Sequence, residues 1–132
     1  MSAANELLKA IHALLAGDAA LSALVGPDGV RDRLVSDRRM PCVVIGEVAS
    51  NDYSTASEAG EEHFLTLEAW SDGGGRREAQ EIAVMVRTLL DDAALELEGY
   101  ALVSLQHCST RTRREPKTKL FVAEMRFRAV TE

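Results

Sequence analysis

The segment HFLTLEAWSDGGGRREAQEIAVMVRTLL, residues 63–90, contains a change of hydrophobic period that decides the fold. Apolar Leu65, Leu67 and Ala69 occupy alternate positions, which predicts a strand over residues 63–70. Three glycines then break the strand. Beyond them a helix is predicted over residues 76–92, because these apolar residues recur at helical spacing: Ala79, Ile82, Ala83, Val86, Leu89 and Leu90.

The residues before this segment begin with two predicted helices. The first covers residues 4–16, where one apolar stripe consists of Leu7, Leu8, Ile11, Leu14 and Leu15. We expect Ser2 to cap this helix and Gly17 to end it in the left-handed conformation. Asp18 is then placed to cap a short second helix over residues 19–25.

Four further segments have the composition of strands. Residues 30–35 predict a short edge strand, and the β-branched run within 41–48 predicts a longer one. Two more strands are predicted over residues 100–110 and 119–131, with a polar turn at 113–118 between them.

These elements follow one another in the order α-α-β-β-β-α-β-β, which is typical of an α+β domain. We expect a mostly antiparallel sheet of four to five strands with the helices packed on one face. The 132 residues are the length of one ordinary domain, so residues 1–132 are expected to form a single unit.

The overall composition excludes several classes of function. The chain is 46% hydrophobic and 27% charged, and its net charge of −6 argues against generic DNA binding, which needs clustered cations. It has no run of 18 apolar residues, and its first residues lack a basic signal region. We therefore expect no membrane partner and a protein that stays in the cytoplasm, where it is made.

The sequence contains no arrangement of residues typical of an active site. His12, His63 and His107 are far apart and lack the spacing of a metal site. Cys42 and Cys108 lie in apolar, strand-like segments, and we expect both to be buried thiols. Adjacent carboxylates occur only on faces expected to be exposed, so no enzyme activity, cofactor or metal is predicted.

Gly73–Arg76, directly before the long helix, is the one feature that suggests anion binding. The N-terminus of a helix presents free amide groups that can bind phosphate. The glycines lack the spacing of the known phosphate-binding loops, however, and also suit a flexible connection. A small anion-binding protein therefore remains an alternative.

Residues 49–62 lose all hydrophobic periodicity and contain almost nothing to bury. We predict a long mobile loop or hairpin arm. Compact domains rarely keep such loops without a use, so the segment is a candidate partner interface. Its candidate contact residues are Asp52, Tyr53, Ser54 and Thr55.

Five cations gather near the turn of the last hairpin in this otherwise acidic chain. They are Arg111, Arg113, Arg114, Lys117 and Lys119. Two interpretations are open: a solvated turn, or an electrostatic contact with an acidic partner subunit or with DNA. No aromatic residues interleave with the cations, which argues against single-strand binding by stacking.

The order of these segments resembles the small tail-completion proteins, or tail terminators, of long-tailed phages and gene transfer agents. The similarity rests on the opening helix pair, the strand beginning Pro41-Cys42-Val43, the segment from Gly60 to Ser71 and the helix after Gly75-Arg76. It also includes the terminal strand that ends Arg126-Phe127-Arg128-Ala129-Val130-Thr131-Glu132.

This resemblance implies a structural role without catalytic residues. Family members are expected to form a ring of six at the head-proximal end of the tail tube. The ring stops tube polymerisation, joins the tail-tube protein to the head connector or stopper, and lets DNA pass through without sequence-specific binding. The expected location is therefore the neck of a phage-like particle. A neighbouring head-completion adaptor or stopper protein is the closest alternative.

Overall fold

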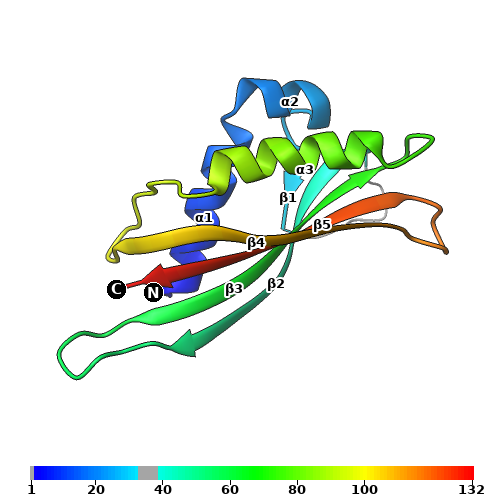
Figure 1. The fold of residues 1–132 in the computed structure, drawn as a ribbon. Helices are drawn as coiled ribbons and strands as arrows, with labels where there is room; N and C mark the ends of the chain where they lie inside the picture. Colours follow the sequence, from blue (N-terminus) through cyan, green and yellow to red (C-terminus); the bar gives the residue numbers. More distant parts are fainter. Residues whose placement is uncertain (1, 33–38) are drawn as a thin grey trace.

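Five strands form one twisted sheet, and three helices cover one of its faces (Figure 1). The computed structural model describes residues 2–32 and 39–132. The elements are α1 (Ala3–Ala16), α2 (Ala19–Val25), β1 (Val30–Arg31), β2 (Cys42–Asp52), β3 (Glu61–Ser71), α3 (Arg77–Leu90), β4 (Leu102–Arg114) and β5 (Phe121–Thr131). The predicted α+β class and the predicted order of elements are confirmed.

The strand order β1-β2-β3-β5-β4 gives the sheet two distinct ends. All neighbouring strands are antiparallel except β1 and β2, which are parallel. β5 begins at Phe121, opposite Arg114, and ends at Thr131, opposite Glu61. The β4–β5 turn and the β2–β3 loop therefore lie at opposite ends of β5, an eleven-residue strand about 33 Å long.

Local capping signals in the sequence place the first two helices. The Asn5 amide donates to Ser2 Oγ at 3.2 Å, and the Leu21 amide donates to Asp18 Oδ2 at 2.9 Å. Both predicted caps are confirmed. The left-handed conformation predicted for Gly17 is wrong, since its φ is −83°. The chain continues the helical turn there and enters the Asp18 cap directly, so no reversal is needed.

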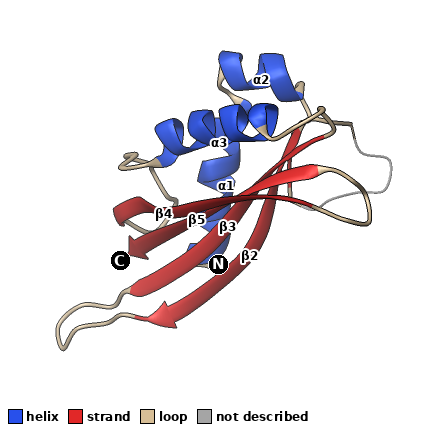
Figure 2. Cartoon of the chain, turned by 45° about the vertical axis from the view of Figure 1, so that its right-hand side comes forward, coloured by secondary structure: helices blue, strands red, loops and turns tan. Residues whose placement is uncertain are grey.

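The main hydrophobic core lies between the helices and the inner face of the sheet, as Figure 2 shows for the layers. The predicted stripes of the helices and of β3 point into it, and β5 contributes alternate residues. Fully buried members include Leu7, Ile11, Leu15, Ile82, Leu67, Met125 and Phe127. Replacing such a side chain with alanine typically costs 2–5 kcal/mol.

A second, smaller cluster lies on the opposite face of the sheet, at the end where β2 begins. Its buried residues are Cys42, Val44, Trp70, Leu120 and Val122, and Met40 packs against them. The apolar run at the start of β2 is thus buried on both faces, with Val43 and Ile45 in the main core and Cys42 and Val44 in the smaller cluster.

The boundaries of four predicted strands change. β1 ends at Arg31, and the remainder of the predicted strand, residues 33–35, lies outside the described residues. Residues 49–52 and 61–62, which were expected to belong to a mobile loop or a hairpin arm, extend β2 and β3, because backbone pairing across a hairpin does not require apolar alternation. β4 continues to Arg114, so Arg113 and Arg114 belong to a strand and not to the turn.

The prediction that Cys108 is buried is wrong, because its side chain is exposed. The β4–β5 register shifts between His107 and Ser109, so Cys108 is the extra residue of a β-bulge. It lies on the edge strand, where no other strand covers it. The expectation that Cys42 is buried is confirmed.

No single helix within residues 2–32 and 39–132 is long and apolar enough to cross a membrane. α1 and α2 together reach the required length and composition, but an 84° bend separates them.

Candidate interaction surfaces

Residues 49–62, here called the arm, form a β-hairpin that projects from one end of the sheet (Figure 1). The Tyr53 amide donates to the Gly60 carbonyl at 2.9 Å, and the Thr55 amide donates to the Glu58 carbonyl at 2.8 Å. The predicted hairpin arm is confirmed. Its tip is exposed and is held by its own hydrogen bonds.

The four candidate contact residues in the arm lie together at the start of its loop. Asp52 Oδ1 accepts from the Ser54 hydroxyl at 2.6 Å and from the Ser54 amide at 3.1 Å. These bonds lower the pKa of the Asp52 carboxyl, so it stays ionised. Tyr53 is 53% exposed, which leaves most of an aromatic ring available to a partner.

Arg128 on β5 anchors the base of the arm. Its Nε donates to Glu62 Oε2 at 2.7 Å, which raises the pKa of the guanidinium further. The same guanidinium lies over the Tyr53 ring, 5.4 Å from its centroid. One cation therefore fixes both strands of the arm.

His63 is buried between three strands beside the arm. Its Nδ1 lies 2.7 Å from Ser50 Oγ, and its Nε2 lies 2.9 Å from Thr131 Oγ1. Burial lowers the pKa of this imidazole, so the neutral form is favoured, with one nitrogen donating and the other accepting. His63 thus links β2, β3 and β5 at the base of the arm.

A groove of about 210 Å³ lies where the arm meets the C-terminus, and we call it the acidic groove. Asp52, Glu61 and Glu132 contribute its carboxylates, and Tyr100 lines another wall. Backbone hydrogen bonds between Glu132 and Ala101 hold the backbone of Glu132 beside the start of β4. Glu61 and Glu132 were not predicted as site residues, because only the β3–β5 pairing brings them together.

Residues 111–119, here called the basic hairpin, occupy the other end of the sheet. Arg111, Arg114, Lys117 and Lys119 are exposed, and Arg113 is half-buried. Glu115 stabilises the turn by accepting from the Thr118 amide at 3.1 Å, which lowers the pKa of its carboxyl. Three of the five predicted cations come from β4, where Arg111 and Arg113 lie opposite Glu124 and Val122 on one face of the sheet and Arg114 lies opposite Phe121 on the other face.

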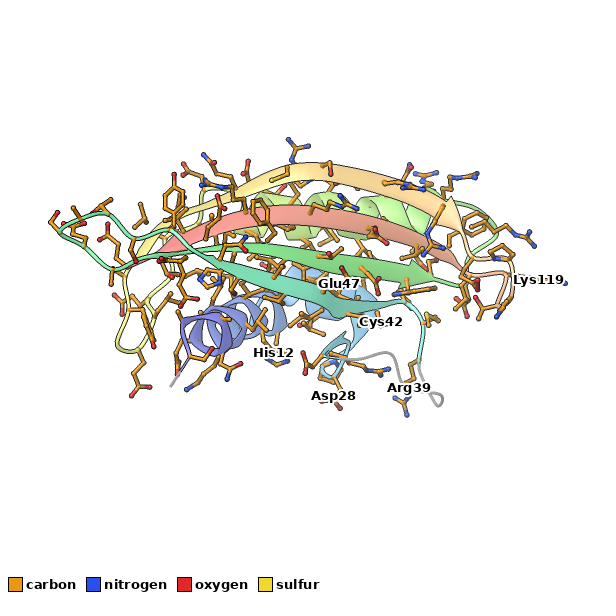
Figure 3. The ribbon with its side chains drawn as sticks, turned by 90° about the horizontal axis from the view of Figure 1, so that it is seen from below. His12, Asp28, Arg39, Cys42, Glu47 and Lys119 are labelled. Carbon is orange, nitrogen blue, oxygen red and sulfur yellow. The ribbon has the colours of Figure 1, made fainter. Side chains whose placement is uncertain are left out.

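The two predicted groups of contact residues are not brought together within the chain. Figure 3 shows Lys119 at one end of the sheet, with the β2–β3 loop at the far end. Among the described residues the ion pairs are Arg77–Glu81 and Arg128–Glu62, so none of the five basic-hairpin cations takes part in one.

A further charged hollow of about 370 Å³ lies on the helix-free face of the sheet. Glu47, Glu68 and Glu124 contribute carboxylates to it, and Arg126 lies among them. Arg111 is the β4 neighbour of Glu124. The cations Arg126 and Arg111 therefore lie near the carboxylates of this hollow and offset part of their negative charge.

The helical layer has an apolar groove of about 630 Å³ between α2 and α3. Leu24 and Val84 line it and are 41% and 62% exposed. Phe64 on β3 and Val103 on β4 are also exposed. These exposed apolar residues were not predicted from the sequence to be contact residues.

The connection that contains Gly73–Arg76 is organised by a carboxylate. Ser71 Oγ donates to Glu78 Oε1 at 2.6 Å and accepts from the Gly73 amide at 3.0 Å. Because Glu78 places negative charge in the first turn of α3, this helix end is unfavourable for an additional anion. Within the described residues, no three histidine, cysteine or carboxylate side chains form a group that could hold a metal ion.

Comparisons with known proteins identify the class to which this fold belongs. A chain from a solved structure described as the virion of a native gene transfer agent particle is 30% identical to this chain. The match covers 99% of this chain and 98% of the other, with a TM-score of 0.90. A comparison with curated protein sequences found no match.

The fold and its projecting, charged ends therefore define a structural protein of phage-type tails. Residues 9–132 match the family described as Tail completion protein gp17. The chain belongs to this tail-completion family, which confirms the resemblance seen in the sequence.

Proposed function

We propose that this chain is one subunit of a six-membered ring that closes the head-proximal end of a phage-like tail tube. The observation that carries the proposal is the similarity, over 99% of the chain, to a chain of a gene transfer agent virion. Membership of the tail-completion family supports the same role.

The proposed mechanism is capping and joining. The ring occupies the growing end of the tube, so another ring of tail-tube protein cannot add, and it offers the head connector or stopper a new surface. DNA passes through the ring without sequence-specific binding, for which a subunit of net charge −6 is suited. No catalysis and no cofactor are needed for these steps.

The contacts in the ring are proposed to be heterologous, so that one patch of each subunit meets a different patch of its neighbour. The arm residues Asp52–Thr55 and the basic hairpin are the proposed contact surfaces. They suit this arrangement because they lie at opposite ends of one sheet. After synthesis in the bacterial cytoplasm, the subunit takes its place in the neck of the particle.

Deletion of the gene in a producing strain tests the proposal. We expect unjoined heads together with tail tubes of irregular and excessive length, visible by negative-stain electron microscopy. Supplying the wild-type gene from a plasmid should restore tailed particles. Tubes of normal length beside heads that have lost their DNA would instead indicate a neck adaptor or stopper and would overturn the capping role.

A further inference from the structure

The basic hairpin and the arm, at the two ends of the sheet, carry net charges of opposite sign. Residues 111–119 carry five cations and one carboxylate, Glu115, which leaves four positive charges. The arm and the last residue carry Asp52, Glu58, Glu61 and Glu132, in addition to Glu62, which Arg128 neutralises. These two segments could therefore attract each other if they came into contact.

These opposite charges cannot neutralise each other within one chain. β5 separates the ends by about 33 Å. The Debye length at physiological ionic strength is about 8 Å, so the attraction between them is almost fully screened. Only a second molecule can bring one end against the other.

We infer that the basic hairpin of one copy docks into the acidic groove of the next copy. This inference rests on the proposed ring, and it names the two surfaces that meet there. The groove holds about 210 Å³, enough for the end of a lysine or arginine side chain between Asp52, Glu61 and Glu132. Such a contact is head-to-tail, so it propagates from subunit to subunit until the ring closes.

The acidic groove suits the hairpin better than the other acidic surface of the chain does. The hollow around Glu47, Glu68 and Glu124 already has Arg126 within it and Arg111 beside it. The carboxylates of the acidic groove have no ion pair among the described residues. Tyr53 and Tyr100 lie beside this groove and supply aromatic surface for a cation or its aliphatic stem.

Charge reversal in particle-producing cells lacking the native gene tests the contact. Arg113→Glu with Arg114→Glu places two glutamates on the hairpin and cancels its net charge, and Glu61→Lys with Glu132→Lys places two lysines in the groove. Each variant alone should lower the number of tailed particles by about tenfold or more, because the new side chains would meet like charges on the native partner surface. Circular dichroism of the purified variants checks that each still folds.

Two rescues make the test specific. One chain that carries all four reversals should restore tailed particles. Co-expression of the two separate variants should also restore them, because the new glutamates then meet the new lysines and native hairpins meet native grooves in an alternating ring. The control combines Arg113→Glu and Arg114→Glu with Glu47→Lys and Glu124→Lys, which change the charge by the same amount as the groove reversals, and should not rescue.

The outcomes separate this contact from the proposed function. Normal particle numbers from both single-surface variants, with the protein still at the head-proximal end of the tail, would overturn the contact and leave the capping role intact. Rescue by the Glu47 and Glu124 control would also overturn it and place the hairpin on the face of the sheet. Absence of the wild-type protein from the tail end would overturn the proposed function itself.

Discussion

Arg128 on β5 pairs with Glu62 on β3, with 2.6 Å between Nη2 and Oε2, at the point where the arm leaves the sheet. The guanidinium also covers the ring of Tyr53. The two side chains of the pair are only 28% and 19% exposed, so water screens the pair less than it screens a surface salt bridge. This pair couples the arm, which is a proposed contact surface, to β5, an internal strand of the sheet.

Replacing Arg128 with glutamine should loosen the arm without unfolding the domain. We expect the paired backbone amides of residues 50–52 and 61–62 to exchange faster with deuterium, and the free energy of unfolding to fall slightly. Arg126→Gln is the matched control, since Arg126 is exposed on the same strand and has no ion pair among the described residues. Equal exchange in the two variants would show that the pair does not hold the arm.

The tip of the arm should be the least protected part of the free subunit. Its hydrogen bonds are exposed and few apolar contacts support them, so the free energy of local opening should be near zero over residues 53–60. Hydrogen exchange on the purified protein measures this directly. Slow exchange across Ser54–Gly60 would contradict the mobility predicted from the sequence.

Burial of His63 should make the domain less stable in mild acid. The unfolded chain takes up a proton near the ordinary histidine pKa of about 6.5, whereas the folded chain does so only at lower pH. Between these values the unfolded state binds more protons, so the free energy of unfolding falls as pH falls from 7. Urea unfolding at a series of pH values measures the slope.

Two histidine variants test which side chains cause this pH dependence of the free energy of unfolding. His63→Gln should flatten it, although part remains because the pKa of His107 is also lowered by burial. His107→Gln should remove this remaining part of the slope. A slope that is the same in His63→Gln and wild type would show that His63 titrates normally in the folded state.

The two cysteines should differ in reactivity. Cys108 should react with a thiol reagent in the native protein, because the β-bulge exposes it, whereas buried Cys42 should react only after unfolding. Cys108→Ser should therefore show no rapid phase of labelling. Rapid modification of two thiols in the folded wild-type protein would contradict the structure of this edge.

Lys119 has a left-handed backbone with φ of 61°, a conformation that favours glycine. Lys119→Gly should therefore raise the free energy of unfolding by up to about 1 kcal/mol in thermal or urea unfolding. The same change removes one charge from the basic hairpin and should lower particle numbers. A variant that is more stable and equally competent in assembly would show that this lysine makes no contact.

Local sequence signals were sufficient to predict the helices and strands. The features that were not predicted depend on how the strands pair in the sheet. The caps at Ser2 and Asp18, the helical stripe of α3 and the alternation in β3 were all readable because each depends on neighbouring residues. The exposure of Cys108 was not, because a bulge is a property of the register between two strands. The acidic groove was missed for the same reason, since Glu61 and Glu132 lie far apart in sequence.

Cryo-electron microscopy of intact particles that contain this protein tests the central claim most directly. We predict six copies in one ring between the head connector and the first ring of the tail tube, with the basic hairpin of each copy against the arm of the next. One copy per particle, or density for the chain at the distal end of the tail, would contradict its role as the head-proximal cap.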